Sequence, residues 1–239
     1  MAIESFTPHE YHADIPCAAV VLRWPDRPLT PADVERLEED ICAIEDDCPQ
    51  AVAILRGSGK SCAGLDCAAF SAEGTSSRLL ARAEKLWRHW DKLPNFKLAA
   101  VEGQYTGLAA TMALGSDLCL MDSQASLAWD EIRHGLTAGI AAWLLPRLIG
   151  LGHARGILLT GRAVTAAEAE RWGLAHRVFC GGDDLERQLA ELLGQLSRLT
   201  ASSRQATRQL LRETWGMAYE NAIGVCLAAQ ARCLNHPEG

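Results

Sequence analysis

The stretch over residues 99–117 constrains the fold more than any other part of the chain. An apolar run leads through two glycines, Gly103 and Gly107, into a series of small residues. This pattern predicts a buried strand, a sharp turn and the start of a helix. The first N–H groups of a helix have no partner within it and attract negative charge. In an enzyme, such a turn can stabilise a developing oxyanion.

Charge and composition exclude several classes of protein. The 239 residues are 49% hydrophobic and 22% charged, with a net charge of −7, as in an ordinary globular protein rather than one that binds nucleic acid. Arg147 and Arg155 interrupt the longest apolar region, so no membrane span is expected. The N-terminus has no pattern of a secretory signal. The nine cysteines are an odd number and lack the regular spacing of a disulfide framework. This indicates reduced thiols and a cytoplasmic protein.

The pattern of apolar residues predicts an α/β protein. Short β-branched or apolar runs predict strands at 18–22, 51–55, 97–101, 117–121, 125–128 and 176–179. Thr30 and Pro31 have the residue types of an N-cap and a first helical position, so a helix is expected to begin there. Further helices are expected at 76–93, 138–148, 153–159, 166–172, 184–196 and 202–234. We therefore expect a core of repeated β-β-α units over residues 1–180 and a helical C-terminal region over 181–239.

A glycine-rich segment after the second strand is similar to a phosphate-binding loop, but it does not complete the motif. The full motif requires a glycine five residues before Gly59, and that position is Ile54. The residues after Lys60 contain a glycine and turn formers instead of the helix that the motif needs. A nucleotide-binding role is therefore not expected.

Several motifs in order along the chain resemble the crotonase family of enoyl-CoA hydratases and isomerases. They are the two glycine-bearing strand exits, Ala63-Gly-Leu-Asp66 and Gly103-Gln-Tyr-Thr-Gly-Leu108, followed by Ala125-x-x-Ala-Trp-Asp-Glu-Ile-x-x-Gly135, Leu145-Pro-Arg-Leu-Ile-Gly150 and Leu159-Thr-Gly-Arg-x-x-x-Ala-x-Glu-Ala-x-x-x-Gly-Leu174. Each motif alone is weak, but the ordered set is specific. The resemblance implies a crotonase-like fold and assembly into homotrimers or hexamers.

The resemblance also implies an oxyanion hole for an acyl thioester. The backbone N–H groups of Leu65 and Leu108 match the two donors of the family, and Gly64 and Gly107 precede them in the two turns. The thioester is carried by coenzyme A or by the phosphopantetheine of an acyl-carrier protein, as part of the substrate. No metal and no further cofactor are expected, because N–H groups hold the oxyanion.

The carboxylates decide which reaction is expected. Hydratases of the family use two glutamates, and here one position holds Glu131 while the other holds Thr111. One carboxylate is enough to move a proton between two carbons or to assist loss of a β-hydroxyl group. The pattern resembles the isomerases of the family and the dehydratases of polyketide β-branching. A decarboxylase and a catalytically degenerate, acyl-binding partner subunit remain alternatives.

Three other side chains have less specific assignments. Trp129 is expected either in the wall of the substrate pocket or in the core. His134 could orient Glu131 or lie in water. His236 lies in the C-terminal region, from which decarboxylases of the family place a histidine over the site, but no role is assigned to it, and the small polar segment 71–77 could border the pocket.

Overall fold

In the part of the chain that the structure describes, the central sheet consists of five parallel strands. The computed structural model describes residues 19–48, 51–66 and 76–235. The strands lie in the order β1-β2-β4-β6-β9. They are β1 (Ala19–Trp24), β2 (Val52–Gly57), β4 (Lys97–Val101), β6 (Leu118–Asp122) and β9 (Arg177–Phe179). Each lies within two residues of a strand predicted from the sequence.

A second, smaller sheet continues three of these strands. It has the order β3-β5-β7-β8, and only its β7–β8 pair is antiparallel. The strands are β3 (Ser61–Cys62), β5 (Gln104–Thr106), β7 (Ser126–Ala128) and β8 (Val164–Thr165). Because β3, β5 and β7 directly follow β2, β4 and β6, the predicted β-β-α repeat is present. The sequence pattern missed β3, β5 and β8, since two or three residues are too few to show alternation.

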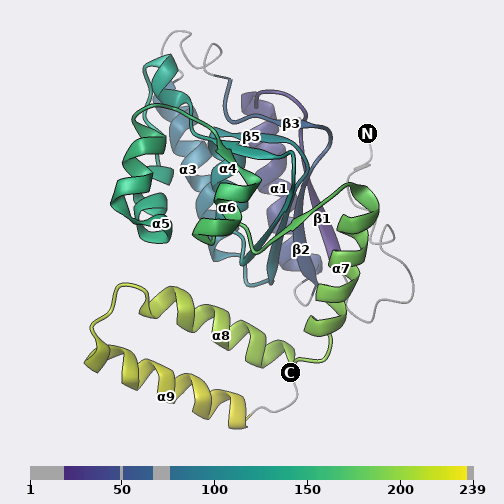
Figure 1. Cartoon of the computed structure of the whole chain (residues 1–239). Helices are drawn as coiled ribbons and strands as arrows, with labels where there is room; N and C mark the ends of the chain where they lie inside the picture. Colours follow the sequence, from purple (N-terminus) through teal and green to yellow (C-terminus); the bar gives the residue numbers. More distant parts are fainter. Residues whose placement is uncertain (1–18, 49–50, 67–75, 236–239) are drawn as a thin grey trace.

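Helices cover both faces of the central sheet (Figure 1). One face packs against α7 (Gly182–Leu196) through its leucines. The larger core on the other face includes apolar side chains of α1 (Pro31–Asp47), α3 (Ser76–Lys92) and α4 (Gly107–Leu114). Helix α6 (Ala166–Trp172) and the 3₁₀ helix η1 (Glu131–His134) are short. The expected α/β architecture is therefore confirmed.

Local sequence signals set the start of α1. Thr30 is its N-cap, Pro31 is its first residue, and Asp33 completes a capping box. Asp33 also accepts hydrogen bonds from both terminal nitrogens of Arg27. The predicted start of this helix is confirmed.

In the second half of the chain one helix prediction is confirmed and one was wrong. The expected pair at 138–148 and 153–159 corresponds to α5 (Ala141–Leu158), which the non-helical backbone of Gly150, with a φ of 78° and a ψ of 156°, divides into two helices at a kink. The expected single helix at 202–234 is two helices, α8 (Ala201–Thr214) and α9 (Tyr219–Asn235). The Met217 N–H donates to the Thr214 carbonyl at 3.0 Å in the turn between them, beside Gly216. Glycine favours such an interruption because it is a poor helix former.

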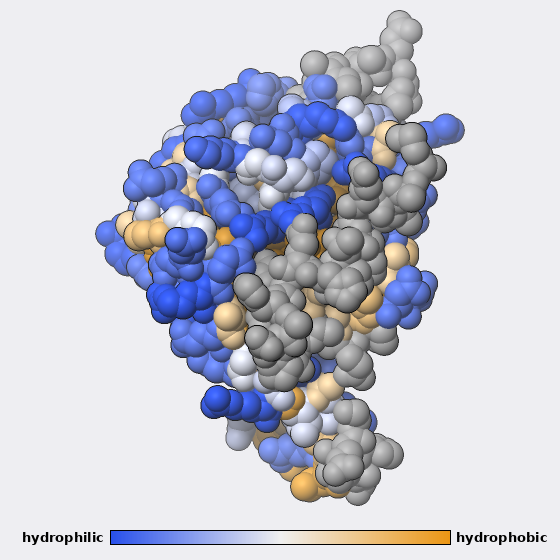
Figure 2. All heavy atoms as spheres, turned by 90° about the vertical axis from the view of Figure 1, so that its right-hand side faces the viewer, coloured by the Kyte–Doolittle hydropathy of each residue, from blue (hydrophilic) through white to orange (hydrophobic). Residues whose placement is uncertain are grey.

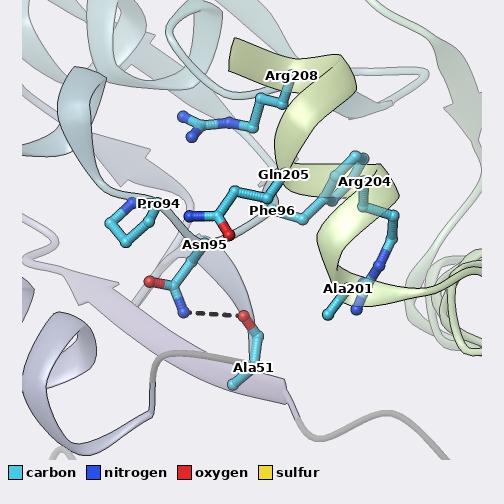
Figure 3. A pocket seen from close by; sticks show the side chains of 8 residues that line it. All are labelled: Ala51, Pro94, Asn95, Phe96, Ala201, Arg204, Gln205 and Arg208. Atoms are coloured by element: carbon cyan, nitrogen blue, oxygen red, sulfur yellow. Dashed lines mark hydrogen bonds between the residues drawn. The ribbon is translucent and has the colours of Figure 1, made fainter. Parts of the chain in front are cut away.

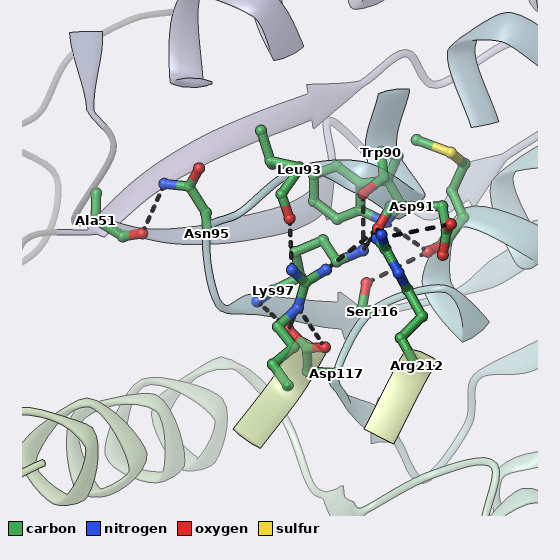
Figure 4. A network of polar contacts seen from close by, with 11 residues as sticks. Ala51, Trp90, Asp91, Leu93, Asn95, Lys97, Ser116, Asp117 and Arg212 are labelled. Carbon is green, nitrogen blue, oxygen red and sulfur yellow. Dashed lines mark hydrogen bonds and ion pairs between the residues drawn. The ribbon is translucent and has the colours of Figure 1, made fainter. Parts of the chain in front are cut away.

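A polar network attaches α8 to the core (Figure 4). The Arg208 Nε donates to both carboxylate oxygens of Asp117 at 2.7 Å, and Asp117 also accepts from the Lys97 backbone N–H at 2.8 Å. The buried Lys97 ammonium group donates to the Trp90 carbonyl at 2.7 Å. The C-terminal helices are thus attached to the start of β4, a strand of the central sheet.

A small cavity of about 40 Å³ lies beside this network (Figure 3). Its walls are α8 and the loop before β4, where the Asn95 amide donates to the carbonyls of Cys48 and Ala51. The cavity and the polar network both belong to the contact between α8 and the core.

Helix α9 packs on α8 and exposes much of its own surface. Tyr219, Leu227 and Leu234 are all more than half exposed. Hydrophobic residues come to the surface at the end of the molecule that α8 and α9 form (Figure 2). No helix in the described part of the chain combines the length and the apolar character needed to cross a membrane.

Candidate active site

The two glycine turns singled out in the sequence lie against each other. A methyl group added at Gly64 would lie 2.8 Å from the Leu108 nitrogen and 3.1 Å from the Gly107 Cα atom. The Gly64 N–H donates to the Thr106 hydroxyl at 3.4 Å. Only glycine lets the two backbones approach so closely. Turns that are about forty residues apart in sequence therefore form one structure.

The directions of the two predicted N–H donors follow from the surrounding backbone. The Leu29 N–H donates to the Gly64 carbonyl at 2.9 Å, and the Asp66 N–H donates to the Leu29 carbonyl at 3.1 Å. In such a parallel bridge, the N–H of the intervening Leu65 faces away from Leu29. Leu108 is the second residue of α4, where an N–H has no partner within the helix.

Both turns open on a cavity of about 530 Å³. Its walls come from the two turns, from α3, from η1 and from the segment that leads into α5. The lining residues are Pro28, Ala63, Gly64, Leu65, Asp66, Leu80, Ala83, Glu84, Trp87, Thr106, Gly107, Leu108, Thr111, Asp130, Glu131, His134, Leu136, Thr137, Ala138, Gly139 and Ile140. All eight predicted site residues except Trp129 are among them.

Glu131 is half-buried, and its carboxyl group lies beside the turn at Gly107. A methyl group at Gly107, whose φ is +54°, would lie 2.9 Å from the Glu131 Oε1 atom. The Oε2 atom is buried and has no hydrogen-bond partner. Burial raises the pKa of Glu131 to about 7; the charge of Asp130 acts in the same direction, and a hydrogen bond with the residue's own backbone opposes it. A carboxyl group with this pKa can both accept and donate a proton near neutral pH.

Thr111 and Trp129 form a buried pair behind the cavity. The Thr111 hydroxyl donates to the Gly107 carbonyl and accepts from the Trp129 indole N–H, both at 2.9 Å. Trp129 is completely buried, so it lies in the core behind Thr111. Thr111 faces the cavity but is held by α4 and by this indole.

The histidines differ in their place. His134 is exposed at the end of η1 and lines the cavity. His236 and residues 71–75 of the segment 71–77 lie outside the described residues. No group of three or more His, Cys, Asp or Glu side chains in the described ranges is arranged to hold a metal ion.

Comparison with known proteins identifies the family. The model of the family described as "Enoyl-CoA hydratase/isomerase" matches residues 28–236. The chain belongs to the enoyl-CoA hydratase/isomerase family. A Thermus thermophilus protein named "Putative enoyl-CoA hydratase" is 32% identical over 231 residues, which cover 90% of this chain and 87% of that relative.

Two further proteins are similar to this chain over most of its length. The 1,2-epoxyphenylacetyl-CoA isomerase of Escherichia coli is 29% identical over 196 residues, covering 79% of this chain and 73% of the isomerase. The crystal structure of an enoyl-CoA hydratase from Bacillus anthracis superposes with a TM-score of 0.84 at 21% identity, covering 97% of this chain and 90% of that one. The crotonase fold is thus shared with solved structures.

None of the family motifs in the sequence identified the side chains of α3 as part of the cavity wall. Leu80, Ala83 and Trp87 line the cavity together with Glu84. Their spacing of three and four residues places them on one helical face. This periodicity was visible in the sequence, but which part of the structure the face covers depends on contacts between distant segments.

Proposed function

We propose that this enzyme isomerises the double bond of an enoyl thioester, with Glu131 as its single acid and base. The observation that carries this proposal is the buried Glu131 carboxyl, whose pKa is raised to about 7, beside the turn that presents Leu108. The names of the relatives agree with thioester substrates, since two are called enoyl-CoA hydratases and one an acyl-CoA isomerase.

In the proposed reaction, ionised Glu131 removes a proton from the carbon next to the carbonyl of a 3-enoyl thioester. The electron pair moves toward the carbonyl oxygen, and the N–H groups of Leu65 and Leu108 stabilise the resulting dienolate. The protonated carboxyl then returns the proton at the far end of the conjugated system, which leaves a 2-enoyl thioester. One carboxylate suffices, because the same proton leaves one carbon and reaches another.

Hydration or dehydration is the second candidate, supported by the names of the hydratase relatives. Thr111, however, stands where hydratases have a second glutamate, and its hydroxyl proton is given to the Gly107 carbonyl. A threonine hydroxyl cannot accept a proton near neutral pH. Glu131 would then have to activate water alone, which favours isomerisation over hydration.

The thioester carrier and the assembly are parts of the same proposal. Coenzyme A is the carrier that the names of the relatives indicate, and an acyl-carrier protein is the alternative. We also infer assembly into homotrimers or hexamers, supported by the exposed apolar side chains of α9. Light scattering of the purified protein measures the mass, and a monomer at micromolar concentration would contradict this inference.

The test of the function uses 3-enoyl, 2-enoyl, 3-hydroxyacyl and malonyl-type thioesters of both carriers. We expect the wild type to isomerise the 3-enoyl substrate, with kcat/KM rising as pH increases through about 7 because ionised Glu131 is the base. Glu131→Gln should lower this rate by about 10²–10⁴-fold. Glu170→Gln removes an exposed carboxylate of α6 and serves as the matched control.

Each outcome of this panel has a distinct meaning. Equal turnover of the wild type and Glu131→Gln would exclude Glu131 as the acid and base. Turnover of only the 2-enoyl and 3-hydroxyacyl substrates would favour hydration. Binding of every thioester without turnover would favour the acyl-binding partner, and carbon dioxide release from malonyl-type thioesters would favour a decarboxylase.

A further inference from the structure

The indole of Trp87 lies between the active-site cavity and a neighbouring cavity. Trp87 follows Leu80 and Ala83 on the cavity face of α3 and is only 8% exposed. Its six-membered ring lies against Gly115, the residue that ends α4. The ring therefore bridges α3 and α4 at the end of the space between them.

Gly115 provides the room for this ring. A methyl group at Gly115 would lie 2.4 Å from two ring carbons of Trp87, closer than atoms can approach. Gly115 lies four residues after Thr111 and seven after Leu108, so the three share one face of α4. Seven residues of helix span about 10 Å. An acyl chain that runs along this face from the predicted oxyanion donor would meet the indole after about that distance.

A second cavity of about 800 Å³ lies beyond Trp87. Trp87 and Ile140 line both cavities, so these two side chains separate them. The walls of the second cavity combine apolar side chains of α5 and α8, including Leu144, Leu211 and the edge-to-face pair of Trp143 and Trp215, with charged side chains such as those of the Lys97, Asp117 and Arg208 network. The apolar side chains among them would pack against an acyl chain if the separating side chains were smaller.

We propose that Trp87 and Ile140 set the limit on acyl-chain length and restrict the enzyme to short acyl thioesters. The inference rests on the proposed function only in that the first cavity binds the acyl group. It requires the two side chains to act as a barrier, and the cavity beyond them to accept methylene groups once the barrier is removed.

The test measures dissociation constants of saturated butyryl-, hexanoyl-, octanoyl- and dodecanoyl-CoA, which bind without reacting. For the wild type we expect affinity to increase from butyryl to hexanoyl and to decrease for dodecanoyl-CoA. Trp87→Ala should increase the affinity for dodecanoyl relative to butyryl-CoA by at least about tenfold, since each buried methylene favours binding several-fold. Ile140→Ala, at a half-buried position, should act in the same direction and tests the barrier even if the tryptophan variant fails to fold.

Gly115→Ala tests the barrier in the opposite direction. The Gly115 backbone has an ordinary φ of −80°, so alanine adds no backbone strain there. Its methyl group should push the indole toward the first cavity and weaken hexanoyl-CoA binding by about tenfold while butyryl-CoA binding changes less. Leu211→Arg, in the wall of the second cavity, should leave wild-type binding of butyryl-CoA unchanged and reverse the gain of Trp87→Ala for dodecanoyl-CoA.

The results separate this inference from the proposed function. A wild type that binds none of the four acyl-CoAs contradicts binding of the acyl-CoA in the first cavity. A wild type that binds butyryl-CoA, with a chain-length profile that neither Trp87→Ala, Ile140→Ala nor Gly115→Ala changes, overturns the barrier alone.

Discussion

The Glu131 carboxyl combines a catalytic position with a cost to stability. Its Oε2 atom is buried without a partner, and burial raises its pKa to about 7. The unfolded chain has the ordinary glutamate value of about 4.3. Between these two values the folded state binds more protons than the unfolded state, so this group makes the fold less stable as pH rises through that window. The site proposed for proton transfer therefore disfavours the charged form of Glu131, at a cost to the stability of the fold.

Glu131→Gln should therefore stabilise the fold while it removes activity. At pH 8 we expect an increase of roughly 1–3 kcal/mol in the free energy of unfolding, because the buried charge is gone. Near pH 4 the difference should disappear, since glutamate is then neutral in the folded state. Urea unfolding at both pH values measures the effect. An equal gain in stability at both pH values would show that the charge of Glu131 is not its cause. Glu170→Gln should leave the free energy of unfolding unchanged at both pH values.

At the scale of elements, the turn between β5 and α4 depends on Gly107. Its positive φ favours glycine, and its missing side chain leaves room for Glu131. Gly107→Ala should lower kcat/KM by at least about 10²-fold, as expected when one oxyanion donor is displaced. Gly173, which ends α6, has a φ of +77° and open space around it, so Gly173→Ala introduces similar strain without the clash.

Both glycine variants should lose about 1–2 kcal/mol of stability from the left-handed backbone, measured by urea unfolding. Only Gly107→Ala should lose activity when both are assayed as folded proteins. Equal activity of the two variants would mean that the turn has no role in the reaction.

Elements with strong local signals were predictable from the sequence, and those fixed by distant contacts were not. The strand, turn and helix around Gly107 and the start of α1 at Thr30 follow from local chemistry. The short strands β3 and β5 exist because they pair with each other. Likewise, the burial of Glu131 and the position of Trp87 depend on segments from different parts of the chain, which no local pattern reports.

At the scale of the whole molecule, the protonation of Lys97, at the contact between α8 and the core, affects the stability of the fold. Burial lowers the pKa of Lys97 to about 7, and the positive charge of Arg208 adds to the effect, while Asp117 and Asp91 oppose it. In the unfolded chain lysine titrates near 10.4. Between these values the unfolded state binds the extra proton, so this group makes the fold more stable as pH rises from about 7 toward 10.

Lys97→Met should remove this pH dependence. The free energy of unfolding of the wild type, relative to that of the variant, should increase by roughly 1–2 kcal/mol between pH 7 and pH 9. Lys92→Met changes an exposed lysine at the end of α3 and should leave the wild-type profile unchanged. Urea unfolding at the two pH values gives the comparison, and parallel profiles for wild type and Lys97→Met would contradict it.

The hydrogen bond between Thr111 and Trp129 also limits how this protein can evolve. A single replacement of Thr111 by an apolar residue leaves the buried indole N–H without its partner, at a cost of about 1–3 kcal/mol. A path through an apolar intermediate therefore first loses stability, unless Trp129 changes as well. A glutamate placed there directly would meet an indole donor already aimed at position 111. A direct change of Thr111 to glutamate therefore keeps a partner for the indole N–H of Trp129, whereas a change to an apolar residue does not.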